Sequence, residues 1–305
     1  MRVAAIDCGT NSIRLLVADV EADELTEIDR RMVIVRLGEG VDTTGAFSPV
    51  ALERTFAACN DYADVITELG AERVRFVATS ASRDVSNRAA FVDGVRTRLG
   101  VTPEVISGDE EAALSFRGAV AGLPAEMIPA PRLVVDIGGG STEFVLGGDL
   151  PTSAVSVDIG CVRMTERHLR SDPPTPAQIE ATEADIAAAV DTAARSVDWS
   201  SARSLIGVAG TVTTIVALAH HLSAYDPAAI HGRSVTADQV EEIAAQLLTM
   251  PRAQRAALAV MHPGRVDVIA GGAMVLRAIL RRTGQEQVTA SETDILDGVA
   301  RALAV

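Results

Sequence analysis

A short pattern, Asp-x-Gly-x-x-Ser, occurs twice in this 305-residue chain, at residues 7–12 and again at 136–141. Each copy follows an apolar run rich in β-branched residues and precedes a second apolar run. A strand, a tight turn and a second strand have this pattern, so we expect two β-hairpins. Because no short-period repeat accompanies them, the pair indicates two duplicated halves rather than a solenoid.

The two turns combine an aspartate at the end of a strand with glycines that leave backbone N–H groups accessible. Such a turn suits a metal-bound phosphate, because the carboxylate holds the cation and the amides hold the phosphoryl oxygens. Asp7 and Asp136 are therefore candidate metal ligands. The alternative is that each aspartate caps its own turn, as aspartate often does. Three successive glycines at 138–140 exceed the needs of a two-residue hairpin, which favours phosphate.

The amino-acid composition excludes several classes of protein and of active site. With 48% hydrophobic and 22% charged residues, the chain is expected to be globular and to form two domains. The net charge of −14 gives no general attraction for nucleic acid, and the absence of lysine excludes a Walker-type phosphate loop and a Schiff base. No apolar run is long enough for a membrane helix, and the three cysteines form no C-x-x-C pair. We therefore expect a cytoplasmic protein without membrane or nucleic-acid partners.

Apolar periodicity predicts alternating strands and helices, as in an α/β protein. Beyond the hairpins, strands are expected at 31–37, 73–78, 102–106, 204–208 and 287–290. Helices are expected at 49–69, 87–99, 110–121, 177–196, 210 onward, 236–248, 252–260, 266–282 and 295–304. The proline-rich stretch 122–131 is the best domain boundary. We predict one domain at 1–125 and a second at 126–305, with a C-terminal helix at about 292–305 packing back on the first.

Glu111 is a candidate general base. Ser107 and Glu110 fit a capping box that opens a helix, which gives Glu110 a structural role. Glu111 then points about 100° further round the helix, where it could deprotonate a water aimed at a phosphoryl group. The alternative is a carboxylate that only complements the helix dipole.

Three further groups have both a chemical and a structural interpretation. Arg83, where a strand gives way to a loop, could bind phosphate bidentately or pair with Asp84 or a surface carboxylate. Gly210 and Thr211 open a helix whose N–H groups could accept an anion, although close packing would also explain the glycine. Glu143, on the strand after the second turn, could assist the metal or face solvent. The histidines lack metal-ligand spacing, and no nucleophile motif is present.

These motifs, taken in order, resemble the exopolyphosphatase and guanosine pentaphosphate phosphohydrolase family. The resemblance rests on IDCGTNSIRLLVAD, ATSASRD, SGDEEAALSF, VVDIGGGSTEF, GVAGTVTT and PGRVDVIAGGAMVL, which span nearly the whole chain. It implies an α/β fold of the actin, hexokinase and Hsp70 type, with duplicated ribonuclease H-like domains and an interdomain active-site cleft. It also implies hydrolysis of terminal phosphates with Mg²⁺, or Mn²⁺, and without a phosphoenzyme.

Matched residue by residue, the resemblance implies three roles. Glu111 would activate water. Asp7 and Asp136 would position the metal, with Glu143 assisting. The phosphate track would be lined by Asn11, Ser12, Arg83, Gly138, Gly139, Gly140, Ser141, Gly210 and Thr211.

Substrate choice stays open between inorganic polyphosphate and a guanosine polyphosphate. Long family members carry a further helical C-terminal part. We do not expect that part in this chain, and this expectation favours short polyphosphate chains. Guanosine pentaphosphate 5'-phosphohydrolysis is the alternative, followed by a regulator that binds guanosine tetra- or pentaphosphate without turnover and by a kinase of the same fold. The resemblance also implies a homodimer.

Overall fold

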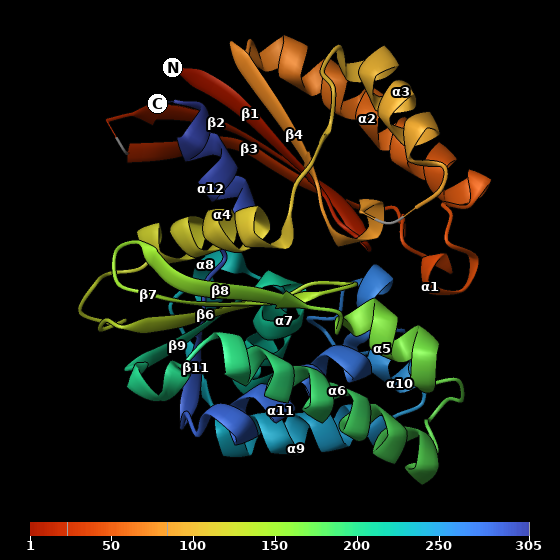
Figure 1. The fold of residues 1–305 in the computed structure, drawn as a ribbon, viewed down its shortest axis with the longest axis vertical. Helices are drawn as coiled ribbons and strands as arrows, with labels where there is room; N and C mark the ends of the chain where they lie inside the picture. The colour runs from red at the N-terminus through yellow and green to blue at the C-terminus, as the bar shows by residue number, and fades with distance from the viewer. Residues whose placement is uncertain (23, 84, 305) are drawn as a thin grey trace. The chain divides into compact units, whose positions relative to one another are not determined.

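The computed structural model describes residues 1–22, 24–83 and 85–304, and these form an α/β protein with two sheets (Figure 1). The chain divides into two compact units. The first comprises Met1–Gly118 with the last helix, α12 (Ile295–Leu303), and the second comprises Ala119–Asp294. The first division falls at Gly118, inside α4 (Gly108–Ala121), whereas the expected boundary lies at residue 125.

Five strands in the order β3-β2-β1-β4-β5 form the sheet of the first unit. They are β1 (Arg2–Cys8), β2 (Ser12–Glu21), β3 (Glu24–Ile34), β4 (Arg73–Ala78) and β5 (Glu104–Val105). The predicted hairpin is β1 with β2, and β1 pairs in parallel with β4. The strand predicted at 31–37 is wrong at both ends. β3 lies at the sheet edge, and its early part carries charged residues that obscure the strand pattern.

Helices cover both faces of this first sheet. Figure 1 shows α2 (Pro49–Leu69) and α3 (Arg88–Leu99) side by side, and they bury Tyr62, Phe76 and Phe91 in one core. The Tyr62 hydroxyl donates to Ile13 O at 2.9 Å. On the other face, α4 and α12 pack so closely that a Cβ on Gly298 would lie 2.1 Å from Leu114 O. A short helix, α1 (Val41–Thr44), follows the sheet edge.

The sheet of the second unit repeats this order with one added strand, as β10-β11-β9-β6-β7-β8. Its strands are β6 (Arg132–Ile137), β7 (Thr142–Gly147), β8 (Pro151–Val157), β9 (Ser204–Val208), β10 (Ser234–Thr236) and β11 (Gln287–Ala290). The second predicted hairpin is β6 with β7, and β6 pairs in parallel with β9. The shared strand order confirms the predicted duplicated α/β fold.

Helices of the second unit surround one large apolar core. They are α5 (Cys161–His168), α6 (Pro176–Ser196), α7 (Ala209–Ala219), α8 (Pro227–Ile230), α9 (Ala237–Thr249), α10 (Arg252–Ala256) and α11 (Ile269–Thr283). Figure 1 shows α6, α9 and α11 lying next to one another, with α11 almost wholly buried. α10 ends at Ala256, four residues before the predicted end. Among the described residues, no helix combines the length and apolar composition that crossing a membrane requires.

Candidate functional site

Both predicted glycine turns are tight and close in the same way. Gly9 N donates to Ser12 O at 2.9 Å in the first unit, and Gly138 N donates to Ser141 O at 3.0 Å in the second. The strand register places Asp7 opposite Arg14 and Asp136 opposite Glu143. The two hairpins therefore carry an aspartate at equivalent positions. The residue that faces it across the strands is positively charged in the first hairpin and negatively charged in the second.

Asp7 is buried in a direct ion pair. Arg14 Nε and Nη2 both donate to Asp7 Oδ2, at 3.0 and 2.6 Å. The side chains are only 7% exposed for Asp7 and 20% for Arg14. Because a guanidinium is permanently charged, it neutralises the Asp7 carboxylate. Our sequence reasoning missed Arg14, although its place seven residues after Asp7 in a hairpin with a tight turn predicts direct opposition.

The turn of the first unit is held in place by the segment after β3. Val35 N and Arg36 N donate to Asn11 O at 3.1 and 2.9 Å, and Gly38 N donates to Thr10 O at 2.9 Å. A Cβ on Gly38 would lie 2.4 Å from Thr10 Cγ2, so glycine is required there. These bonds use only the backbone carbonyls of the turn. The side chains of the turn, including the two candidates Asn11 and Ser12, are not used by them.

Glu111 and Arg83 meet in the first unit. Arg83 Nη2 donates to Glu111 Oε2, and Arg83 Nε donates to Ile106 O at 3.2 Å. Glu111 is 8% exposed, so its carboxylate is not a solvated helix-end charge. Asp84, the other partner considered for Arg83, lies outside the described residues.

The neighbouring Glu110 has a separate structural contact. Ser107 Oγ accepts from Glu110 N at 3.2 Å, which is one half of the predicted capping box. The Glu110 carboxylate accepts from Arg75 Nη2 on β4 at 2.6 Å instead of serving the other half. Two adjacent glutamates therefore point to different arginines, and Glu111 has the more buried site.

Glu143 is almost fully buried, which excludes the solvent-facing alternative. Its exposed fraction is 1%, and its Oε1 accepts from Ser141 Oγ and Ser156 Oγ, both at 2.7 Å. Ser156 lies on β8, a strand the apolar pattern did not reveal because it is a half-exposed edge strand. Asp136 is also buried, at 8% exposure. The two carboxylates lie on the same face of neighbouring strands, with Cβ atoms about 5 Å apart in such a pair.

The carbonyl groups of the second glycine turn all contact the start of α5. Cys161 N donates to Gly138 O at 3.0 Å, Val162 N to Gly139 O at 2.9 Å, and Arg163 Nε to Gly140 O at 2.7 Å. In a trans peptide, the N–H points opposite to the carbonyl of the same peptide unit. The next three N–H groups, at residues 139–141, therefore point away from α5 together. Successive N–H groups turned to one side form an anion-binding concavity.

Gly210 and Thr211 open α7 beside an arginine that the sequence reasoning left without a role. A Cβ on Gly210 would lie 2.4 Å from Arg265 Cζ, so a side chain at this position would displace the guanidinium. Arg265 Nη1 donates to Thr214 Oγ1 at 3.2 Å, and its guanidinium lies 5.5 Å from the centre of the Tyr225 ring. The signal for Arg265 was its place in the string PGRVDVIAGGAMVL, one of the motifs of the resemblance.

Tyr225 extends this cluster. Its hydroxyl lies 2.7 Å from both Thr213 Oγ1 and Glu292 Oε1. Burial raises the pKa of Tyr225 to about 12, so the phenol is neutral at physiological pH. Thr211 is itself buried. Its hydroxyl packs against Gly272 so closely that a Cβ on that glycine would lie 2.4 Å from Thr211 Oγ1.

The candidate metal ligands are paired carboxylates rather than a larger cluster. Within residues 1–22, 24–83 and 85–304, no group of three or more His, Cys, Asp or Glu side chains is arranged to hold a metal ion. Mg²⁺ is commonly bound by one or two carboxylates plus water and substrate phosphate. Asp136 and Glu143 fit this requirement. At Asp7, Oδ2 accepts both hydrogen bonds from Arg14, and the other carboxylate oxygen, Oδ1, is buried.

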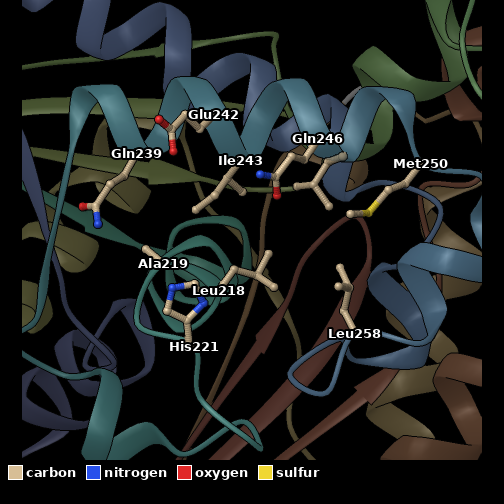
Figure 2. A pocket seen from close by; sticks show the side chains of 10 residues that line it. Leu218, Ala219, His221, Gln239, Glu242, Ile243, Gln246, Met250 and Leu258 are labelled. Carbon is tan, nitrogen blue, oxygen red and sulfur yellow. The ribbon is translucent and has the colours of Figure 1, made fainter.

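A separate cavity of about 250 Å³ lies in the second unit between the end of α7 and α9 (Figure 2). Its lining is mostly aliphatic, with the side chains of Gln239, Glu242 and Gln246 from α9 and His221 beyond α7. None of the predicted site residues lines it. The Glu242 carboxylate repels anions, so this cavity does not suit a phosphate chain.

Comparisons with a family model, with protein sequences and with solved structures all match phosphatases or exopolyphosphatase-like proteins. The model of the Ppx/GppA phosphatase family matches residues 16–303. Exopolyphosphatase 2 of Mycobacterium tuberculosis (strain H37Rv) is 52% identical over 316 residues, which cover 99% of this chain and 98% of that protein. The crystal structure of an exopolyphosphatase-like protein has a TM-score of 0.96 at 44% identity and covers 99% of this chain and 97% of its own.

A weaker match carries a different activity in its name. The guanosine-5'-triphosphate,3'-diphosphate pyrophosphatase of Pseudoalteromonas atlantica is 35% identical over 196 residues, which cover 64% of this chain and 37% of that protein.

Proposed function

This chain belongs to the Ppx/GppA phosphatase family, and from that premise we propose that it releases phosphate from the ends of inorganic polyphosphate, short chains in preference to long ones. The observation that carries the proposal is the 52% identity to Exopolyphosphatase 2 across nearly the full length of both chains. The Glu111–Arg83 pair and the amides at 139–141, which point away from α5, supply chemistry that fits a terminal phosphoanhydride.

The proposed reaction needs positioning and charge neutralisation more than covalent help. Glu111 accepts a proton from water as the water oxygen attacks the terminal phosphorus. The bond from phosphorus to the bridging oxygen breaks, and that oxygen keeps its electron pair on the shortened chain. The hydrogen bond from Arg83 to Glu111 Oε2 fixes the position of the carboxylate that acts as the base.

The second unit would supply the contacts to the phosphoryl oxygens. The N–H groups at 139–141 donate to one phosphate, and the N–H groups of the first turn of α7, at Gly210 and Thr211, donate to another. Asp136 and Glu143 would hold Mg²⁺, or Mn²⁺, which when bound neutralises charge on the phosphoryl oxygens. Ser141 and Ser156 keep the Glu143 carboxylate oriented for this role. In the first unit, Asn11, Ser12 and Arg83 would bind the phosphate chain.

A substrate panel tests the proposed activity. We measure phosphate release from short polyphosphate, long polyphosphate and guanosine pentaphosphate, each with Mg²⁺ and with EDTA. We expect Mg²⁺-dependent release that is fastest on short polyphosphate. The Glu111→Gln protein, purified in the same way, serves as the blank for contaminating phosphatases. Release that is equal in EDTA, or absent from both polyphosphates, contradicts the proposal.

The guanosine nucleotide is the second candidate substrate, favoured by the match to a pyrophosphatase of that nucleotide. Faster release from guanosine pentaphosphate than from either polyphosphate would establish it. Binding of the nucleotide by calorimetry without any release would instead indicate a regulator.

Two further parts of the proposal concern the oligomeric state of the protein and its location in the cell. We propose a homodimer that works in the cytoplasm. Light scattering on the purified chain tests the dimer, and a mass of one chain at micromolar concentration contradicts it.

A further inference from the structure

The cavity between the end of α7 and α9 lies wholly within the second unit and has no part in the proposed hydrolysis. Its volume of about 250 Å³ is just below the range of about 300–1,000 Å³ that is typical of sites for drug-sized molecules. Its apolar side chains belong to the edge of the large core, where Leu247 is 1% exposed and Ile243 and Leu258 are half-buried. A small molecule with an apolar body would therefore be shielded from water here.

The polar groups at the cavity include two side chains of α9 that no other residue engages. Glu242 and Gln246 are four residues apart, so they lie on the helix face that also carries Ile243 (Figure 2). Among the residues that the structure describes, none forms a hydrogen bond or an ion pair with the Glu242 carboxylate or the Gln246 side-chain amide. The adjacent Glu241, in contrast, accepts from Arg281 Nε and Nη2 at 3.0 and 2.7 Å.

The charge at the cavity selects the class of ligand. Of the described residues that line it, Glu242 is the one acid, and none is a lysine or an arginine. A carboxylate attracts a cation and repels an anion. An ammonium group has three N–H donors, and the Glu242 carboxylate and the Gln246 carbonyl oxygen are acceptors for them. The cavity therefore suits a positively charged amine.

His221 lines the cavity on the side opposite α9 and has an uncommon backbone conformation (Figure 2). Its φ of 52° lies in the left-handed region, which glycine adopts most readily just after a helix. His221 N donates to Leu218 O at 3.0 Å. Leu222 N donates to Ala217 O at 3.1 Å, so the turn that ends α7 is well formed with histidine where glycine is favoured. Residues held in such conformations concentrate at binding and catalytic sites.

From these observations we propose that the cavity binds a small amine with an apolar body. The apolar body lies against Ile243 and Leu247. The ammonium group donates to Glu242 and Gln246, and His221 contacts the molecule from the end of α7. The apolar surface supplies most of the affinity, while Glu242, which is exposed at the rim, sets the preference for positive charge. The inference does not depend on the proposed release of phosphate.

Three probes with the same apolar body and different charge test the site. They are phenethylammonium, phenethyl alcohol and 3-phenylpropionate, each titrated into the full chain and followed by ligand-observed NMR. We expect phenethylammonium to bind about fivefold more tightly than the alcohol, and the carboxylate to bind most weakly. Glu242→Gln should abolish the preference for the ammonium, whereas Glu241→Gln, the matched control, should keep it. Equal binding of the three probes, or an equal effect of the two exchanges, overturns the proposal.

Two further variants locate the binding. Ile243→Trp fills the cavity, and we expect it to abolish binding of phenethylammonium. His221→Gly removes the ring and suits the left-handed backbone, so binding should weaken about threefold while the midpoint of urea unfolding stays equal or rises. Circular dichroism shows whether each variant is folded. Undiminished binding in both folded variants overturns the proposal. So does a natural protein that binds no probe but changes from dimer to monomer on Ile243→Trp, because the cavity would then be an interface between two copies.

Discussion

The two glycine turns close through the same backbone hydrogen bond and differ in what holds them. The first is tied to the segment after β3 through the carbonyls of Thr10 and Asn11, and its aspartate is paired with Arg14. The second is tied to the start of α5 through three successive carbonyls, and its aspartate faces Glu143. Duplication supplied two copies of one turn, and the cross-strand and loop contacts gave them different chemistry.

From this difference we propose different tasks for the two units. The first unit carries the buried Glu111–Arg83 pair, which suits proton transfer and phosphate binding. The second carries the carboxylate pair and the amides at 139–141, which suit a metal-bound phosphate. Each of the following predictions changes one side of this comparison.

The largest expected effect is at Glu111. Glu111→Gln keeps the shape of the side chain but removes the proton acceptor, and we expect turnover to fall by about 10³-fold. Glu110→Gln is the matched control, because Glu110 faces Arg75 and should change turnover by less than about threefold. Phosphate release under substrate saturation measures both. Comparable losses in the two variants would remove Glu111 from the role of base.

The next effect concerns the attachment of the second turn to α5. A Cβ on Gly160 would lie 2.4 Å from Gly139 O, and Gly160 itself is extended (φ −157°), so alanine acts through this contact alone. We expect Gly160→Ala to lower the free energy of unfolding by about 1–3 kcal/mol and to weaken phosphate binding. Gly148→Ala, with open space around its Cβ, is the control. Urea unfolding and calorimetry with phosphate measure the pair, and equal behaviour of both variants would contradict the account.

A smaller effect is expected at Ser156, which orients Glu143 from β8. Outer hydrogen bonds to metal ligands contribute about 10-fold or more to metal affinity. Ser156→Ala should therefore raise the Mg²⁺ concentration for half-maximal activity by about tenfold while the rate at saturating Mg²⁺ changes little. Ser153→Ala on the same strand is the control. A fall in rate that excess Mg²⁺ does not restore would show that Ser156 acts in some other way.

The smallest effect appears only at alkaline pH, at the residue that begins α5. Burial raises the pKa of the Cys161 thiol from 9.0 to about 11. The folded state favours the protonated thiol, so stability is complete below pH 9 and declines as the pH rises from 9 to 11. Cys161→Ala should lessen this decline by up to about 2 kcal/mol. Urea unfolding at pH 7, 9, 10 and 11 measures it, and an equally steep decline in the variant would contradict the shift.

The hairpins, the duplicated order and most helices were predictable because they depend on local signals. Apolar runs that end in Asp and Gly mark the hairpins, and Gly70 and Pro176 mark helix boundaries. The edge strands β3 and β8 were misplaced or missed because they are half-exposed and carry polar residues. α5 was missed because its eight residues make only about two helical turns, which is a short window in which to recognise a helical period.

The contacts between candidate residues were harder to predict, since they depend on register and on tertiary packing. Glu111 and Arg83 could be nominated separately, but no spacing rule pairs residues 28 positions apart. Ser156 contacts Glu143 only because β8 lies beside β7 in one register. Arg14 was within reach of sequence reasoning, because the tight first turn fixes which residue faces Asp7.

The most direct test of the contrast is a Mg²⁺ titration of phosphate release for Asp7→Asn and Asp136→Asn, measured side by side on short polyphosphate. We predict that Asp136→Asn requires at least tenfold more Mg²⁺ for half-maximal activity, because it removes half of the carboxylate pair. Asp7→Asn should leave that concentration unchanged within about twofold, even where its maximal rate is lower. An equal increase in both variants, or an increase confined to Asp7→Asn, would contradict the assignment of the metal to the second unit.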